Sequence, residues 1–153
     1  MKGCVIDASI AIKWVVEESG SDQALKLRQQ TTLIAPDLLV AECANILWKK
    51  VQREELSPDE ANLAARLLQG ADIELVPTRS LLATATAIAI ELDHPAYDCL
   101  YLALAAARGC LFVTMDERLL RKLGQGATSK WRDAAISLTA AAARAAGPDD
   151  SAV

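Results

Sequence analysis

The sequence has few of the residues that build several common kinds of site. Its 153 residues include a single histidine, 4% aromatic residues and four cysteines. The cysteines are scattered and form no CxxC pair, so neither a zinc site nor a disulfide framework is expected, and we interpret them as small buried thiols. The histidine, His94, directly precedes Pro95 and is expected to lie at the start of a helix.

Long apolar runs are missing as well. No run reaches the roughly 18–20 residues that span a bilayer. The segment after Met1 has no long apolar stretch followed by a small-residue cleavage site, so no membrane contact is expected and the cytoplasm is the expected compartment. The motifs GxSxG, GxGxxG and the Walker loop do not occur, which leaves serine hydrolase, Rossmann and P-loop functions without support.

Short apolar segments alternate with helical patterns, and 52% of the residues are hydrophobic. Strands are expected at about 2–6, 32–35, 71–77, 110–114 and 134–137, and helices at about 8–17, 20–30, 37–53, 58–70, 79–92, 95–109 and 115–123. Ser57 and Glu60 frame a capping box, and Thr114 and Glu117 are interpreted as a second one. Such alternation predicts an α/β fold with a parallel sheet covered on both faces. One domain is expected over 1–138, followed by a helix end and frayed tail over 139–153.

Two aspartates occupy the same kind of place in this pattern. Asp7 and Asp116 each lie at or just past the carboxyl end of an apolar strand, where a helix begins. This edge of an open parallel sheet is where ligands bind. Asp is also a favoured N-cap residue, so helix capping is an equally simple interpretation of either aspartate alone.

Two further acids are harder to explain by structure. Glu42 is on the same helical stripe as Leu38 and Ile46, and Asp98 lies in the first turn of the most apolar helix. A charge in such a place is costly unless it is paired. Lysines seven or eight residues after Glu42 are too distant to pair with it, and no lysine or arginine lies within a turn of Asp98. We therefore expect a functional role for both.

These four acids can coexist in one pocket only with a positive charge among them. Two carboxylates about 4 Å apart repel each other by about 4 kcal/mol at an effective dielectric constant near 20. Hard oxygen ligands favour Mg²⁺ or Mn²⁺ over zinc. Such ions support phosphoryl chemistry, because they lower the pKa of a bound water and stabilise a leaving oxygen.

The net charge of −4 argues against a nucleic-acid partner at first sight. Two divalent ions would cancel it. Lys13 follows Asp7 by less than two turns and Arg118 follows Asp116 by two residues, so both could meet a phosphate backbone near the metals. A solvated helix face is the competing interpretation for each of them.

The ordered set of acidic motifs resembles a known family. The segments VIDASIAIKW, APDLLVAECANILWKK, AYDCLYLALAAARG and LFVTMDERL are similar to those of the PIN-domain ribonucleases, especially the VapC toxins of toxin–antitoxin pairs. The likeness covers about residues 2–137. It implies a three-layer α/β/α sandwich with a short parallel sheet.

The resemblance also implies a function and a site. Asp7, Glu42, Asp98 and Asp116 would be the catalytic, metal-binding acids of a Mg²⁺- or Mn²⁺-dependent endoribonuclease that hydrolyses RNA with a metal-activated water. The small polar residues beside them would support the ligands: Ser9, Asn45 and Thr114. A small cognate antitoxin and a homodimer are the implied protein partners.

Three other functions stay open on the sequence. One is a non-catalytic PIN-like module that only binds a partner through its acidic groove. A second is a PIN-type nuclease that cuts DNA or flap structures. The third is a phosphoacceptor domain of the receiver type, which the sequence favours least because Asp7 has no acidic neighbour and no lysine ends a late strand.

Overall fold

A five-stranded parallel sheet forms the centre of the protein. The computed structural model describes residues 1–125 and 130–147. The strands lie in the order β3-β2-β1-β4-β5, and each neighbouring pair is parallel. Their bounds are β1 Gly3–Ile6, β2 Thr32–Pro36, β3 Glu74–Val76, β4 Leu111–Thr114 and β5 Ala135–Ser137. The predicted α/β class is therefore confirmed, and β1 lies in the middle of the sheet.

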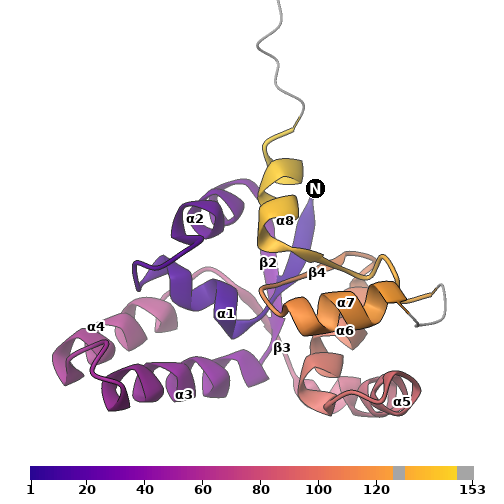
Figure 1. Ribbon diagram of the computed structural model, residues 1–153, viewed down its shortest axis with the longest axis horizontal. Helices are drawn as coiled ribbons and strands as arrows, with labels where there is room; N and C mark the ends of the chain where they lie inside the picture. Colours follow the sequence, from indigo (N-terminus) through magenta and orange to yellow (C-terminus); the bar gives the residue numbers. More distant parts are fainter. Residues whose placement is uncertain (126–129, 148–153) are drawn as a thin grey trace, which may run out of the picture.

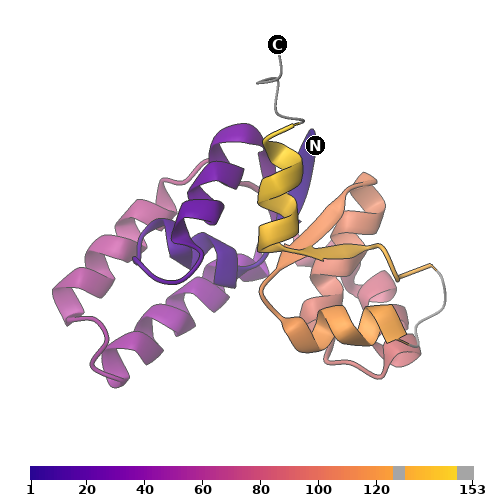
Figure 2. The ribbon, with the colours of Figure 1, turned by 45° about the horizontal axis from the view of Figure 1, so that its top comes forward.

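Helices surround the sheet on both sides. They are α1 Ala8–Ala11, α2 Ser21–Gln30, α3 Leu38–Gln52, α4 Pro58–Gln69, α5 Leu82–Leu92, α6 Ala96–Arg108, α7 Glu117–Gln125 and α8 Leu138–Ala145, with short 3₁₀ helices η1 Ile12–Trp14 and η2 Thr78–Leu81. In both ribbon views α3 and α4 lie on one side of the strands and α5 and α6 on the other (Figures 1 and 2). The chain thus forms the three layers that the sequence predicted.

The core forms where α6 packs on the central strands β1, β2 and β4. Helix α6 is buried over Tyr101–Ala105, and the Tyr101 ring stacks on Phe112 of β4 with centroids 5.3 Å apart. The helix ends at Gly109, whose φ of 61° lies in the left-handed region that glycine adopts without a steric penalty. The helix predicted over about 95–109 is confirmed.

The other helices agree with the sequence predictions, with a few differences at their ends. The Ser57–Glu60 capping box at the start of α4 is present, as predicted. The helix expected over 8–17 instead ends as the 3₁₀ turn η1, just before Val15 and Val16, β-branched residues that are weak helix formers. The helix expected over 79–92 begins as the 3₁₀ turn η2, in which Leu81 is buried, and Leu82 at the start of α5 is 65% exposed.

The C-terminal part of the described chain packs against the domain. Leu138, Ala141 and Ala142 of α8 are buried, and this helix contacts α2 and the strands β4 and β5. The boundary expected after residue 138 stays a prediction, and residues 148–153 of the expected tail lie outside the described residues. Across residues 1–125 and 130–147, no helix has the length and apolarity to cross a bilayer.

Candidate metal centre

Asp7 follows the central strand β1 and is held by hydroxyl groups. Its carboxylate accepts a hydrogen bond from Ser9 Oγ and another, 2.6 Å long, from Thr114 Oγ1 at the end of β4. The residue is at the N-cap position of α1, yet its side chain makes no capping hydrogen bond. Capping therefore does not explain this carboxylate, which is 9% exposed.

The environment of Asp7 disfavours its charge. Burial raises the pKa of the Asp7 carboxyl above its usual range, and the hydrogen bonds from Ser9 and Thr114 offset only part of this effect. The negative charge of Asp98 raises the pKa further. Among the described residues, no positive charge compensates that of the Asp7 carboxylate.

Glu42 borders the buried stripe of α3, which consists of Leu39, Cys43 and Leu47. Its Oε1 accepts a hydrogen bond of 3.0 Å from the hydroxyl of Tyr101. Burial raises the pKa of Glu42, the Tyr101 hydrogen bond lowers it, and the charges of Asp7 and Asp98 raise it again. Glu42 is therefore electrostatically coupled to both aspartates.

Asp98 has a partner that the sequence analysis did not assign. Its Oδ2 lies 2.6 Å from Nε2 of His94, one turn earlier. His94 does lie just before α6, as predicted, but its ring faces Asp98 rather than only marking the helix start. Ligand atoms of His94, Asp98 and Asp116 all lie within 4.8 Å of one another, which is the spacing of a group that could hold a metal ion.

Asp116 joins the same edge of the sheet from the β4–α7 turn. Its Oδ1 accepts from the backbone N–H of Leu119 at 3.0 Å, so Asp116 caps α7. The capping box predicted for Thr114 and Glu117 is wrong, because Thr114 is the last residue of β4 and its hydroxyl instead donates to Asp7 and accepts from the N–H of Asp116. Thr114 therefore connects two of the acids.

The structure links all four predicted acids, which we call the carboxylate cluster: Asp7, Glu42, Asp98 and Asp116. Within the described residues, the lysine and arginine ion pairs involve other acids, namely Glu18, Glu55 and Glu74. In the part of the chain that the structure describes, the carboxylate cluster thus has the His94 imidazole beside it but no lysine or arginine partner. This donor set fits a divalent cation, which would supply the missing positive charge.

Only some of the residues predicted to support the ligands or to bind RNA contact the carboxylate cluster. Ser9 and Thr114 contact Asp7 directly, whereas Asn45 is exposed one turn after Glu42. Lys13 is 8% exposed and its Nζ donates to Glu18 at 2.9 Å. This geometry argues against the predicted contact of Lys13 with a phosphate backbone, because the ammonium group is already paired. Arg118 is exposed on α7, two residues from Asp116.

Sequence reasoning missed two residues of this site. His94 precedes Asp98 by four residues, and this helical i, i+4 spacing was the available signal. Tyr101 follows Asp98 by three residues within an apolar run, where nothing in the pattern indicates that its hydroxyl reaches Glu42 on another helix.

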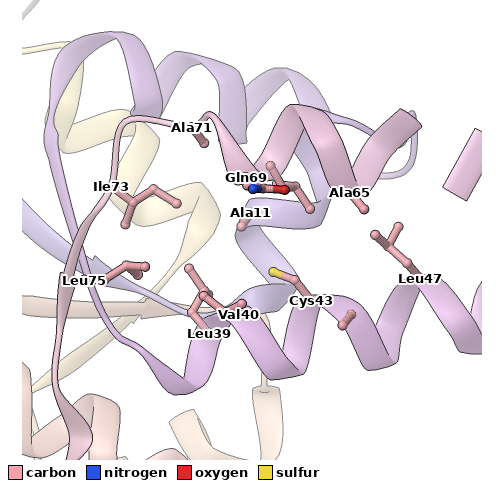
Figure 3. Close-up of a pocket in the computed structure, with 12 residues that line it drawn as sticks. Ala11, Leu39, Val40, Cys43, Leu47, Ala65, Gln69, Ala71, Ile73 and Leu75 are labelled. Atoms are coloured by element: carbon pink, nitrogen blue, oxygen red, sulfur yellow. The ribbon is translucent and has the colours of Figure 1, made fainter. Parts of the chain in front are cut away.

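An apolar cavity of about 360 Å³ lies between α3, α4 and β3, and none of the four acids of the carboxylate cluster is among its lining residues (Figure 3). Figure 3 shows side chains from these elements around it, including Leu39, Cys43 and Leu75. Burial raises the pKa of the Cys43 thiol to about 12, so this sulfur stays protonated and is a poor metal ligand. The cavity is therefore not a second metal centre.

The raised pKa of Asp7 predicts how stability depends on pH. A carboxyl group whose folded-state pKa exceeds its unfolded value contributes stability at low pH that is lost as pH rises through the folded pKa. With EDTA present, the free energy of unfolding of the wild type is expected to fall, relative to that of the Asp7→Asn variant, as pH rises above the ordinary value of 3.8. Urea unfolding between about pH 4 and pH 8 measures this difference.

The exposed Asp72, in the loop before β3, offers a matched control. Its replacement by asparagine should leave the pH profile parallel to that of the wild type. If the free energy of unfolding of Asp7→Asn also changes with pH in parallel with that of the wild type, the charge on Asp7 does not destabilise the fold. That outcome would contradict the effect of burial described above.

Comparisons with known proteins agree on one family. The model of the PIN domain matches residues 4–126. The chain is 34% identical over 121 residues to Ribonuclease VapC3 of Pyrobaculum aerophilum, which covers 77% of this chain and 92% of that protein. It is 31% identical over 115 residues to Ribonuclease VapC9 of Mycobacterium tuberculosis, covering 75% of this chain and 87% of the relative.

Solved structures share the fold. A crystal structure of a Pyrobaculum aerophilum protein superposes with a TM-score of 0.66 at 22% identity, covering 95% of this chain and 96% of that one. A toxin–antitoxin complex from Klebsiella pneumoniae contains a chain with a TM-score of 0.51 at 13% identity, covering 74% of this chain and 87% of that one. Both likenesses support the topology described above.

Proposed function

Because this chain belongs to the PIN-domain family, we propose that it is a metal-dependent endoribonuclease of the VapC type, the toxin of a toxin–antitoxin pair. Relatives named ribonucleases match most of its length. The observation that carries the proposal is the carboxylate cluster at one edge of the sheet, which has no lysine or arginine partner among the described residues. Such a site suits a divalent ion, and the named relatives act on RNA.

In this proposal, different neighbouring residues orient the acids that hold the metal. Asp7 would hold the metal from the centre of the sheet, oriented by Ser9 and Thr114. Glu42 is aimed by Tyr101, and Asp98 and Asp116 complete the ligand set. When bound, Mg²⁺ or Mn²⁺ supplies a more acidic water and neutralises the charge on the leaving oxygen. Asn45 stays a predicted neighbour, one turn from Glu42 on the solvent side.

The RNA backbone would approach over α7. Arg118 is exposed beside Asp116 and carries a positive charge that a phosphate can contact. Single-stranded loops are the expected targets, because their backbone can enter a site that a duplex does not fit. We place this activity in the cytoplasm, where such RNA is found.

Two protein partners belong to the proposal. A small antitoxin would neutralise the enzyme, supported by the fold that this chain shares with a component of a toxin–antitoxin complex. A homodimer is the expected assembly of the toxin itself. Co-expression with the neighbouring reading frame, followed by size-exclusion chromatography with light scattering, tests both.

Removal of divalent ions tests the proposed chemistry. Purified protein should cleave a labelled structured RNA in Mn²⁺ or Mg²⁺, and EDTA should abolish cleavage until excess metal is added. Single-stranded DNA and a DNA flap serve as parallel substrates. Cleavage of DNA alone would assign a different nuclease, and metal binding without cleavage of any substrate would indicate a binding module.

A further inference from the structure

We propose that His94 is a direct nitrogen ligand and that, with Asp98 and Asp116, it forms a mixed nitrogen–oxygen metal position that prefers first-row transition ions such as Mn²⁺ and Zn²⁺ over Mg²⁺. This inference deepens the proposed function, on which it rests for the presence of a metal at this edge. It adds a donor that the acidic pattern does not contain.

The distances suit one shared ion. His94 Nε2 lies 2.6 Å from Asp98 Oδ2. One ring nitrogen of His94, one carboxylate oxygen of Asp98 and one of Asp116 all lie within 4.8 Å of one another. Ligand atoms that bind one such ion at about 2.0–2.2 Å lie at most about 4.4 Å apart. A shift of less than about 1 Å in the side-chain positions therefore brings all three donor atoms within bonding distance of one cation. The bonds to the cation then replace the hydrogen bond between His94 and Asp98.

The backbone holds the imidazole in this place. Asp93 adopts a left-handed conformation with φ of 48° at the end of α5, and the N–H of His94 donates to the carbonyl of Ala89 at 3.1 Å. Lys122 of α7 donates to the carbonyl of Asp93 at 2.6 Å. The turn that carries His94 is thus tied to both α5 and α7, and the contact of Nε2 with Asp98 orients the ring.

The neighbours of the His94 ring at this edge of the sheet are acidic. The His94 side chain is 11% exposed, its Nε2 contacts Asp98, and one of its ring nitrogens lies within 4.8 Å of a carboxylate oxygen of Asp116. Carboxylates alone suit Mg²⁺, whereas an imidazole raises the affinity for first-row transition ions. The His94 position therefore shifts the metal preference of the whole site away from Mg²⁺.

The single histidine of the chain makes a direct test possible. Untagged protein labelled with ¹⁵N-histidine gives one set of imidazole signals. On titration with Zn²⁺, a diamagnetic ion, the Nε2 resonance should move to a metal-bound position with saturation at one equivalent, and Mg²⁺ should leave it nearly unchanged. The Asp98→Asn and Asp116→Asn variants should both lose the Zn²⁺ response, and Glu117→Gln, an exposed neighbour of Asp116, should retain it.

Calorimetry on a variant separates ligation from positioning. His94→Gln keeps an N–H donor for Asp98 but loses the imidazole. We expect its Mn²⁺ affinity to fall about tenfold or more, with less than about a threefold change for Mg²⁺. An Nε2 resonance that does not respond to Zn²⁺, or equal losses for Mn²⁺ and Mg²⁺ in His94→Gln, would overturn the inference.

The test of the His94 metal position can fail or succeed independently of the test of the nuclease function. RNA cleavage with an unresponsive Nε2 resonance would retain the nuclease and remove His94 from its ligands. A responsive resonance in a protein that cleaves no RNA would support the metal position and contradict the nuclease.

Discussion

Replacing Asp7 by asparagine is expected to lower the rate of RNA cleavage by roughly 1,000-fold or more while the protein stays folded. Asp7 is the buried carboxylate at the end of the central strand, so its charge is the one that solvent can least replace. The amide cannot supply that charge to a cation. The shape of the side chain is retained, and one of its two hydroxyl contacts can be kept by the amide oxygen.

Single-turnover cleavage of labelled RNA, with circular dichroism of the same samples, measures both parts of this prediction. Asp98→Asn is expected to behave in the same way, and Glu117→Gln on the exposed face of α7 should retain activity within about twofold. Asp7→Asn protein that cleaves at the wild-type rate, in a preparation free of contaminating nuclease, would remove Asp7 from the site. Loss of the folded circular dichroism signal would contradict the structural half of the prediction.

Truncation of Tyr101 is expected to give the largest loss of stability among the site residues. The ring is fully buried in α6 and stacked on Phe112, so Tyr101→Ala leaves a large cavity and should cost about 3–5 kcal/mol of unfolding free energy. Tyr101→Phe keeps the ring and removes only the hydroxyl that donates to Glu42. Its cost should be about 1 kcal/mol.

Urea unfolding compares these variants with Tyr97→Ala, a matched control on the same helix. Tyr97 is 69% exposed, so its loss should change stability by less than about 0.5 kcal/mol. The Tyr101→Phe variant also tests the link to the metal, because Glu42 loses the donor that aims it. We expect weaker Mn²⁺ binding in this variant, and unchanged binding would mean that Glu42 is positioned without Tyr101.

Local sequence signals were enough to predict the fold. The capping box at Ser57 and the glycine at 109 act within a few residues of themselves, so they can be interpreted without knowing the rest of the chain. The positions of Asp7 and Asp116 followed from a rule about parallel sheets, in which the carboxyl ends of neighbouring strands meet. Since β1 and β4 are adjacent in the sheet, that rule holds here.

The details that were missed depend on contacts between distant segments. Lys13 is one residue of a patch that also contains Glu18 and Lys50, and the burial of Lys13 follows from how α3 packs beside the loop after η1. His94 follows the left-handed turn at Asp93, and its ring contacts Asp98. Neither the packing nor the turn is encoded in the spacing of nearby residues. The spacing alone therefore predicts a phosphate contact for Lys13, with a solvated helix face as the alternative, and a helix start for His94.

The strand order has a consequence for when the protein becomes active during its synthesis. Thr114 lies on the strand beside that of Asp7, but it is synthesised more than 100 residues after Asp7, and Asp116 follows it. A partly translated chain holds one wall of the site without the other. The four acids can therefore meet only after β4 and the turn to Asp116 have been synthesised.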